Sequence, residues 1–354
     1  MEHLWKQNLR QIEPYVPGEQ SSDPDRIKLN ANENPYPPAP GVEAVLRSYD
    51  PAALCLYPDA NARLLKASIA RHYGVAPEQV FVGNGSDDVL ALAFQSFFNS
   101  DKPIAFPDIT YSFYPVWCRL FHIPFVTHPL TADFRMDPAD YAAPNGGVVL
   151  PNPNAPTSIG EDLPFVQALL EGNRDAVVII DEAYADFGGV SAVPLLADYP
   201  NLLVCGTFSK SRSLAGLRLG FAIGSAELIG VLEAVKNSYN SYTVDNLSLL
   251  CGAAAMDDEA YFAKTTAAVI TTRERVRRAL EQMGFSVLPS RTNFLFATKA
   301  GASMRELFLY LKQRHIYIRY FDLPRIDNYV RITIGTDAQM DAFLQGTEAF
   351  LRGE

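Results

Sequence analysis

The stretch AVVIIDEAYADF (176–187) and the segment LLVCGTFSK (202–210) decide the fold predicted for this chain. Each begins with a short apolar run and then turns polar. Five further runs of this kind occur: QVFVG (79–83), PIAF (103–106), PFVTH (124–128), GVVL (147–150) and LGFAIG (219–224). Helical patterns separate them, so they predict an α/β fold with a mostly parallel sheet buried on both faces. Ligands of such sheets bind beyond the carboxyl ends of the strands, where the informative polar residues fall.

From about Asp245 the pattern changes to that of a smaller α+β domain. Helices are predicted at 246–256, 258–283, 303–313 and 337–351, and strands at 293–297, 316–320 and 329–334. The segment from Pro14 to Pro40 is rich in proline and asparagine and predicts an extended arm. We expect an N-terminal arm (1–29) that joins the small domain, a large domain (30–245) and a small C-terminal domain (246–354).

The composition excludes several classes of protein. The 354 residues carry a net charge of −10, whereas non-specific nucleic-acid binding needs a basic surface. The four cysteines form no CxxC pair and no histidine has metal-ligand spacing, so we expect free thiols and no metal. The N-terminal segment is too polar for a signal peptide, and no run approaches the about 18 apolar residues of a membrane span. We expect a cytoplasmic protein that binds neither nucleic acid nor membranes.

Lys210 follows the apolar run 202–206 and lies between Ser209 and Ser211, with Arg218 eight residues further on. A lone lysine on a loop is usually a solvated charge. Hydroxyl groups and an arginine beside a lysine, however, suit the phosphate of an anionic cofactor. A lysine in such a site can form an imine with an aldehyde.

Asp181 ends the apolar run 176–181, and Tyr184 follows three residues later. A strand-end aspartate often only caps a turn. In the functional interpretation its carboxylate faces the pyridine nitrogen of pyridoxal 5′-phosphate (PLP) and keeps that nitrogen protonated, so that the ring accepts electrons from a substrate carbanion. Tyr184 could donate a hydrogen bond to the phenolic oxygen of the ring.

The string FVGNGSDDVLALAF (81–94) predicts a strand, a glycine-rich turn and a helix. Free amides at the helix start, near Ser86 and Asp87, can hold a phosphate. An ordinary strand–turn–helix is the alternative, because the string matches neither GxGxxG nor a P-loop. Tyr111 follows another predicted strand and could stack on a cofactor ring or pack in the core.

Together these segments resemble the fold-type I PLP-dependent aminotransferases over nearly the whole chain. The pairing of DEAY (181–184) with SKSRSLAGLR (209–218) is specific to that superfamily. Within it, KLNANENPYPP (28–38), LYPD (56–59), GNGSDD (83–88), PNPNAPTS (151–158) and RYFDLPRIDNYVRITIGT (319–336) are similar to the histidinol-phosphate aminotransferase family.

The resemblance implies a role for each matching residue. Lys210 would bind PLP as an imine and, once freed, move the substrate Cα proton; Asp181 would pair with the ring nitrogen and Tyr184 with the phenolic oxygen. The other implied cofactor contacts are Tyr111 on the ring, the phosphate-binding residues Ser86, Asp87, Thr207, Ser209 and Arg218, and Tyr57 from the neighbouring subunit of a homodimer. The implied substrate contacts are Arg331 and Arg319, which would bind anionic groups, and Tyr15 and Asn30 of the arm.

One segment departs from the family pattern N-P-x-N-P-T-G. Here Ala155 takes the place of the asparagine next to proline, and Ser158 replaces the glycine. We expect Asn154 to bond the phenolic oxygen instead.

The resemblance implies transamination between L-histidinol phosphate and 2-oxoglutarate, which yields imidazole acetol phosphate and glutamate. Aromatic amino-acid transamination and phospho-amino-acid decarboxylation on the same scaffold are alternatives. A ligand-sensing module fused to a DNA-binding region is disfavoured by the net charge of −10, and a nicotinamide dehydrogenase by the missing GxGxxG fingerprint.

Overall fold

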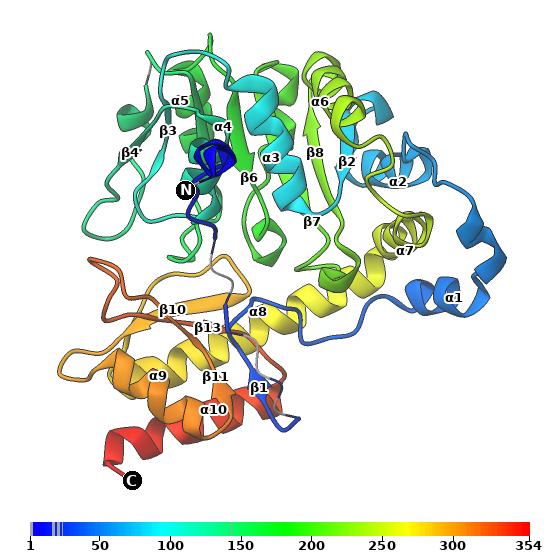
Figure 1. Cartoon of the computed structure of the whole chain (residues 1–354). Coiled ribbons are helices and arrows are strands. Elements are labelled where there is room, and N and C mark those ends of the chain that lie inside the picture. Colours follow the sequence, from blue (N-terminus) through cyan, green and yellow to red (C-terminus); the bar gives the residue numbers. More distant parts are fainter. Residues whose placement is uncertain (1–2, 16–17, 20–21, 23, 143) are drawn as a thin grey trace.

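The computed structural model describes residues 3–15, 18–19, 22, 24–142 and 144–354. Among them is a seven-stranded sheet in the order β2-β8-β7-β6-β5-β3-β4 (Figure 1). Its strands are β2 (Val80–Gly83), β3 (Ile104–Pro107), β4 (Phe125–His128), β5 (Gly147–Pro151), β6 (Val178–Asp181), β7 (Leu202–Thr207) and β8 (Gly220–Gly224). Neighbours are parallel except at β8, which is antiparallel to both β2 and β7. The mostly parallel sheet is thereby confirmed, and each of the seven apolar runs supplies one strand.

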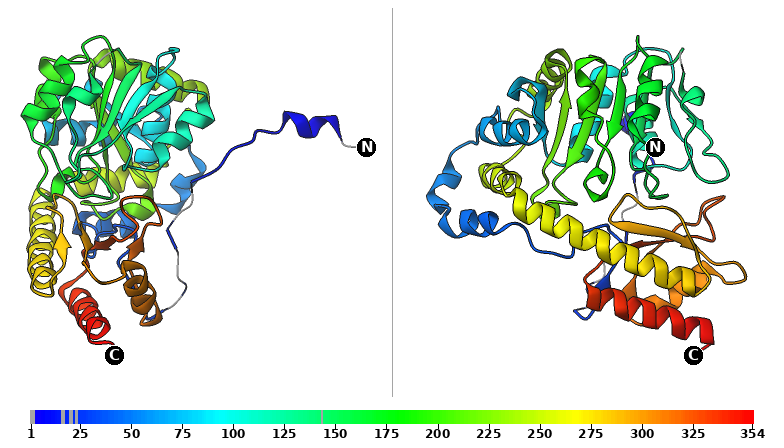
Figure 2. Two further views of the ribbon diagram at one scale, coloured as in Figure 1. Left: turned by 90° about the vertical axis from the view of Figure 1, so that its left-hand side faces the viewer. Right: turned by 180° about the vertical axis from the view of Figure 1, so that it is seen from behind.

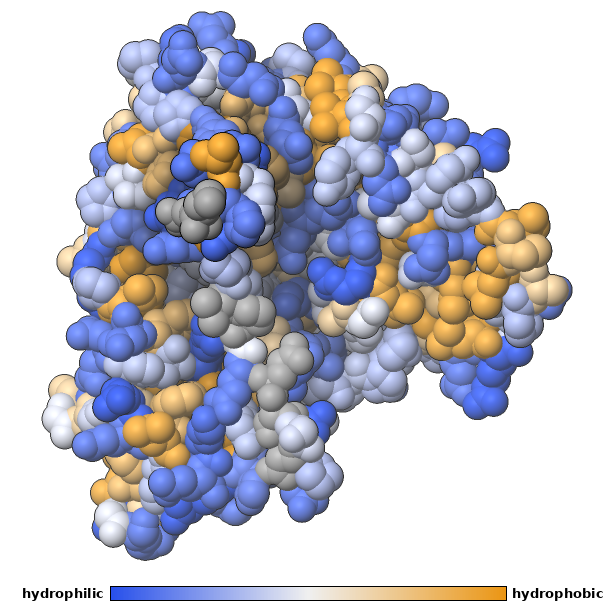
Figure 3. All heavy atoms as spheres, in the orientation of Figure 1, coloured by the Kyte–Doolittle hydropathy of each residue, from blue (hydrophilic) through white to orange (hydrophobic). Residues whose placement is uncertain are grey.

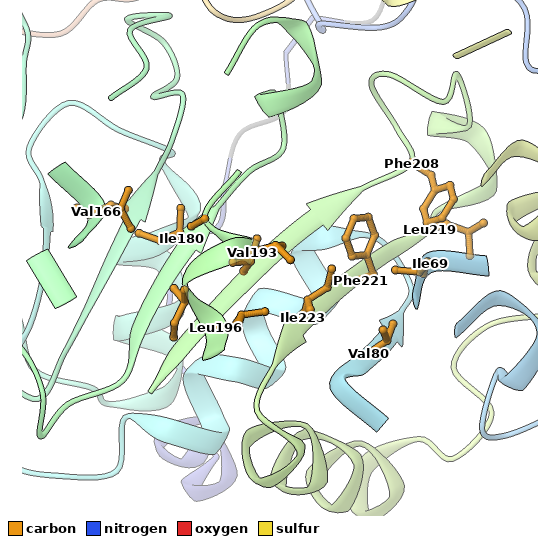
Figure 4. Packing of buried hydrophobic residues seen from close by; sticks show 14 of the residues in the cluster. Ile69, Val80, Val166, Ile180, Val193, Leu196, Phe208, Leu219, Phe221 and Ile223 are labelled. Carbon is orange, nitrogen blue, oxygen red and sulfur yellow. The ribbon is translucent and has the colours of Figure 1, made fainter. Parts of the chain in front are cut away.

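Successive side chains of the central strands enter two different cores, as the period of two in a strand requires. Ile180 and Ile223 belong to the cluster on one face, part of which is drawn in Figure 4, whereas Ile179 and Ala222 belong to the cluster on the other. Four helices contribute to the first cluster: α1 (Pro40–Ser48), α2 (Arg63–Tyr73), α5 (Leu163–Glu171) and α7 (Asn246–Asp257). Three helices contribute to the second: α3 (Ser86–Phe97), α4 (Phe113–Phe121) and α6 (Ala226–Tyr239). Burial on both faces explains why the strands lack an apolar–polar alternation.

The C-terminal part of the chain builds a separate, smaller sheet. The long helix α8 (Glu259–Gln282) leads to it (Figure 2), and four short strands follow in the order β12-β13-β10-β9. The elements are β9 (Ser286–Val287), β10 (Phe294–Thr298), α9 (Met304–Gln313), β11 (Ile316–Tyr317), β12 (Arg319–Tyr320), β13 (Val330–Thr333) and α10 (Asp337–Arg352). A third apolar cluster packs this sheet against α8, α9 and α10. The domain boundaries at 29/30 and 245/246 stay predictions.

The prediction of one strand at 316–320 was wrong. β11 pairs with β1 (Ile27–Lys28), parallel to it, while β12 pairs with β13 in the four-stranded sheet. Between them Ile318 is buried, so the chain changes partners at this residue. Through β1 the N-terminal segment contributes to the C-terminal unit, although its 3₁₀ turn η1 (Leu4–Asn8) lies away from the body (Figure 2).

The connections contain further short 3₁₀ turns: η2 (Pro51–Cys55), η3 (Pro77–Gln79), η4 (Pro138–Tyr141), η5 (Ala185–Phe187), η6 (Val193–Ala197) and η7 (Ala215–Leu217). Of these, η5 follows β6 and η7 precedes β8, so both lie near the sheet edge that carries the site. None of the described helices has the length and apolar character needed to cross a membrane.

Candidate active site

A cavity of about 400 Å³ lies at the carboxyl ends of β6 and β7. Its walls come from both sheets and from the segment after β1. All the predicted site residues except Asn154 and Tyr57 line it, namely Tyr15, Asn30, Ser86, Asp87, Tyr111, Asp181, Tyr184, Thr207, Ser209, Lys210, Arg218, Arg319 and Arg331. Residues that are more than 300 positions apart in the chain thus meet in one space.

Lys210 lies in the turn after β7 and extends its amine into the cavity wall. Its Nζ donates a hydrogen bond of 3.2 Å to the carbonyl oxygen of Ala31 and lies 5.8 Å from the centre of the Tyr184 ring. The backbone of this turn is held from outside, because Asn34 Nδ2 donates to the carbonyl oxygens of Lys210 (3.0 Å) and Ser211 (3.3 Å). The Lys210 amine is held by one long hydrogen bond, while the backbone of its turn is fixed. This arrangement suits a lysine that must react with a carbonyl compound.

Asp181 is buried at the end of β6. Its carboxylate accepts hydrogen bonds from the Tyr114 hydroxyl (3.0 Å) and from the amide of Ala183 (3.1 Å). Burial raises the pKa of Asp181 to about 6, and the bond from Tyr114 partly offsets that rise. A cationic group or a hydrogen-bond donor in the cavity would strongly stabilise the charged form of such a buried carboxylate, because few donors contact it now.

Donors for an anion gather at one end of the cavity. The start of α3 presents free amides near Ser86, and the hydroxyls of Thr207 and Ser209 lie 3.0 Å apart. The guanidinium of Arg218 adds a positive charge 3.6 Å from the Asp87 carboxylate. Helix amides, hydroxyls and an arginine together form a typical phosphate site.

Glycine is required where β8 approaches this helix start. A Cβ atom on Gly220 would lie 2.3 Å from the carbonyl carbon of Gly85 and 2.4 Å from the amide nitrogen of Ser86. Gly85 itself has a φ of 90°, which side-chain-bearing residues rarely adopt. The two glycines let the strand and the helix amides come together at the anion-binding end.

Tyr111 lines the cavity and also belongs to the aromatic core. Its hydroxyl donates to Asp87 Oδ1 at 2.7 Å, and its ring meets Tyr114 edge-on at 5.7 Å. Tyr111 therefore packs against the core and faces the cavity, and its stacking on a cofactor ring stays a prediction.

Two arginines from the small sheet also line the cavity. Arg319 on β12 and Arg331 on β13 are direct partners across the two strands. Arg331 donates to the carbonyl oxygen of Asn30 (2.8 Å), but its Nε is buried without a hydrogen-bond partner. Burial and the nearby Arg319 lower the pKa of Arg331, and no ion pair joins Arg331 to a carboxylate within the described residues. Such a buried positive charge calls for an anionic ligand.

Two predicted residues lie outside the cavity. Asn154 is buried in its loop, where Nδ2 donates to the Ile109 carbonyl (3.0 Å) and the Thr157 hydroxyl (2.9 Å). Both of its amide hydrogens are therefore used, and Ala155 lines the cavity instead. Tyr57 is 81% exposed and stacks on Tyr242 with ring centres 4.5 Å apart.

Sequence reasoning missed residues that hold the predicted site residues in place. Tyr114 bonds Asp181, Asn32 bonds Tyr184, and Asn34 holds the Lys210 turn. The two asparagines stand in the quoted string 28–38, so they could have been singled out. Nothing in the sequence pairs Tyr114 with Asp181.

Comparison with known proteins agrees with this geometry. The profile of the family described as aminotransferase class I and II matches residues 24–346. A histidinol-phosphate aminotransferase of Chromohalobacter salexigens is 52% identical over 352 residues, covering 99% of this chain and 100% of that protein. Histidinol-phosphate aminotransferase 1 of Methylococcus capsulatus is 51% identical, covering 100% of this chain and 99% of its own length.

A solved structure shares the fold. The histidinol-phosphate aminotransferase from Sinorhizobium meliloti, in complex with pyridoxal-5′-phosphate, superposes with a TM-score of 0.81 at 26% identity, covering 92% of this chain and 90% of that one. The chain therefore belongs to the class I and II aminotransferases, and within them to the histidinol-phosphate aminotransferase family.

Proposed function

We propose that this protein uses PLP to transfer the amino group of L-histidinol phosphate to 2-oxoglutarate, with imidazole acetol phosphate and glutamate as products. The observation that carries the proposal is a single cavity lined by two groups of residues. The first group consists of a lysine, a buried carboxylate and a phosphate-type donor set, and the second is a pair of arginines that form no ion pair with a carboxylate among the described residues.

The residues of the first group fit PLP. The start of α3, Thr207, Ser209 and Arg218 would hold its phosphate, Lys210 would bind its aldehyde carbon, and Asp181 would face its ring nitrogen. The buried Asp181, with its raised pKa, supports this orientation because a protonated ring nitrogen would supply the missing positive partner. When bound, PLP supplies an electron sink for the electrons left behind by the departing Cα proton.

Side chains of this protein would then transfer the protons and position the cofactor ring. The amine of Lys210 would accept a proton at the substrate carbon and return it at the cofactor carbon, which is general acid–base work. Tyr184 and Asp181 would keep the two sides of the ring fixed, and the Asn34 bonds would hold the Lys210 turn in register.

The second group of residues would select the substrates. Arg331 can bind either a carboxylate or a phosphate through its planar guanidinium, and Arg319 adds charge beside it. One arginine pair could thus accept both the phosphate of histidinol phosphate and a carboxylate of 2-oxoglutarate. The relatives at 51–52% identity, named as histidinol-phosphate aminotransferases, support this donor over an aromatic amino acid.

A homodimer with shared sites belongs to the same proposal. Exposed apolar side chains gather over α1, η2 and the start of α2, where Figure 3 shows a broad hydrophobic surface: Leu46, Leu54, Leu56, Tyr57 and Leu64. A surface of this kind favours association. Tyr57 lies within it, so a second subunit would bring its own Tyr57 toward the cavity. The cytoplasmic location stays a prediction.

Product analysis tests the proposed reaction. The holoenzyme, given L-histidinol phosphate and 2-oxoglutarate, should form glutamate and imidazole acetol phosphate in equal amounts without releasing carbon dioxide. A preference for phenylalanine or tyrosine as amino donor would replace the substrate assignment. Carbon dioxide from a phospho-amino acid would replace the reaction class.

A further inference from the structure

A buried asparagine lies directly behind the tyrosine of the cavity. Asn32 is 1% exposed, and its Nδ2 donates a hydrogen bond of 2.9 Å to the hydroxyl oxygen of Tyr184. Both residues line the cavity. Neither the sequence motifs nor the proposed mechanism gives Asn32 a task.

Thr333 of β13 fixes the orientation of the Asn32 amide. The Thr333 oxygen accepts a bond from the backbone N–H of Asn32 (3.0 Å), and its own hydroxyl proton goes to Asn32 Oδ1 (2.9 Å). A reversed amide would direct two N–H donors at the Thr333 oxygen and remove the acceptor of its proton. The donor end of the Asn32 side chain must therefore face Tyr184.

The backbone around Asn32 is held as firmly as its side chain. Its carbonyl oxygen accepts a bond from Asn293 Nδ2 (2.9 Å), and the preceding carbonyl, on Ala31, accepts the Lys210 amine. Asn32 has a φ of 56°, in the left-handed region that asparagine, aspartate and glycine tolerate better than other residues. Such an over-determined polar position indicates that its geometry has a purpose.

We propose that Asn32 is a positioning residue that makes the Tyr184 hydroxyl a hydrogen-bond donor toward the cavity. A tyrosine hydroxyl carries one proton, and Asn32 already supplies the bond that its oxygen accepts. The proton is then left for an acceptor in the cavity. The inference rests on the proposed function, in which that acceptor is the phenolic oxygen of PLP.

The charged groups around Tyr184 make this control of direction useful. The Lys210 amine lies 5.8 Å from its ring, and Arg331 on β13 interacts with it electrostatically. In the lysine-bound cofactor, the phenolic oxygen would share a proton with the Lys210 nitrogen. A hydrogen bond donated by Tyr184 to that oxygen would weaken its hold on the shared proton. Loss of the hydrogen bond from Tyr184 should therefore raise the pH at which the visible band of the lysine-bound cofactor changes.

The test is a pH titration of that visible band in the holoenzyme. Asn32→Asp keeps the size and tolerates the positive φ, but its carboxylate only accepts, so Tyr184 must donate to it instead of to the cofactor. Glycine in Asn32→Gly also adopts the positive φ, and this substitution removes the Nδ2 donor without adding charge. We expect Asn32→Asp to raise the midpoint by roughly one pH unit, the scale of one hydrogen bond to a charged group. Asn32→Gly leaves the Tyr184 hydroxyl free to rotate, so it should raise the midpoint by less.

A matched pair at Thr333 gives a second route that leaves the backbone of Asn32 unchanged. Thr333→Ser keeps the hydroxyl and should keep the wild-type midpoint. Thr333→Val removes the hydroxyl, frees the Asn32 amide to turn, and should raise the midpoint. Thermal unfolding of each variant separates this effect from general damage, which would lower stability without moving the midpoint.

Each Asn32 variant is also made in a Tyr184→Phe background. The proposal predicts that the shift disappears there, because no hydroxyl is left to orient. An unmoved midpoint in both Asn32 variants, or an equal shift with Phe at position 184, would overturn it, since the added charge alone would then explain the result. These outcomes leave the proposed function intact, whereas a wild-type protein without a visible band would overturn both.

Discussion

At the scale of single residues, the site concentrates charge that the protein buries at a cost. Asp181 has a pKa raised to about 6, Glu182 has one raised to about 8, and the pKa of Arg331 is lowered. Burial is the first cause in all three, so each charged form is less stable than in water. Asp181 and Arg331 face the cavity and can be neutralised by ligands, whereas Glu182 points behind it.

Arg331 tests the idea of a shared anion site. Arg331→Gln removes the charge while keeping a hydrogen-bonding side chain, so KM should rise for both L-histidinol phosphate and 2-oxoglutarate. We expect roughly tenfold or more for each, because a hydrogen bond to a charged group contributes about 1.5–3 kcal/mol. Steady-state kinetics with Arg352→Gln, an exposed arginine of α10, provides the control. A rise in KM for only one substrate would show that the two anions bind at different places.

Glu182 gives a pH dependence whose sign can be worked out. Its carboxylate accepts the amide of Ala192 (2.6 Å), and burial raises its pKa from the ordinary 4.5 to about 8. Between these values the folded protein keeps a proton that the unfolded chain has lost. The contribution to stability is therefore complete below pH 4.5 and disappears as the pH rises through about 8.

Glu182→Gln should flatten this dependence, because the amide stays neutral and can still accept the Ala192 bond. The measurement is the thermal unfolding midpoint of the cofactor-free protein from about pH 5 to 8. Glu348→Gln, on the exposed face of α10, should keep the wild-type slope. Parallel curves for wild type and Glu182→Gln would refute the assignment.

At the scale of elements, apolar runs predict strands well when both faces are buried. All seven strands of the large sheet follow from them, because burial leaves a continuous apolar signal. The hydropathy pattern also predicted β11 and β12 as one strand. The change of pairing at Ile318, from β1 to β13, does not alter the hydropathy of the sequence. β1 and β9, of two residues each, are too short to show a period.

The site followed the same rule at this scale. Residues next to strand ends, such as Asp181 and Lys210, line the cavity because their position follows from the sheet. The direction of Asn154 was not, because it depends on hydrogen bonds inside its loop. Tertiary partners such as Tyr114, which joins Asp181 from another element, leave no trace in spacing.

The close approach of β8 to α3 makes an element-scale prediction. Gly220→Ala would place a Cβ atom 2.3 Å from the Gly85 backbone and push the α3 amides away from the anion-binding end. The dissociation constant for PLP should rise roughly tenfold or more, as expected for a lost bond to a charged group. Gly230→Ala on α6, where a Cβ meets nothing within 4 Å, is the control and should bind PLP normally. Equal affinities in both variants would show that the glycine contact does not build the cofactor site.

At the scale of the whole molecule, the cavity joins two sheets and the segment after β1. Tyr57 is exposed and lies outside this cavity, and in the proposed homodimer it would complete the site of the second subunit. Hybrid dimers test this arrangement. A subunit with Lys210→Ala supplies an intact Tyr57, and a subunit with Tyr57→Ala supplies an intact Lys210.

Mixing and refolding the two impaired variants should restore activity to about a quarter of the wild-type value, because half of the random dimers are hybrids and each has one complete site. Size-exclusion chromatography of the mixture checks that dimers have formed. If the mixture is only as active as the sum of the two variants assayed alone, the sites are not shared.

The most direct measurement of the central claim is a visible absorption spectrum of the purified protein with PLP, recorded before and after L-histidinol phosphate is added. We predict a yellow band that is absent in Lys210→Ala and that converts to the spectrum of pyridoxamine phosphate when the donor is added. A wild-type protein that gains no band with PLP, or a band that persists unchanged in Lys210→Ala, would contradict it.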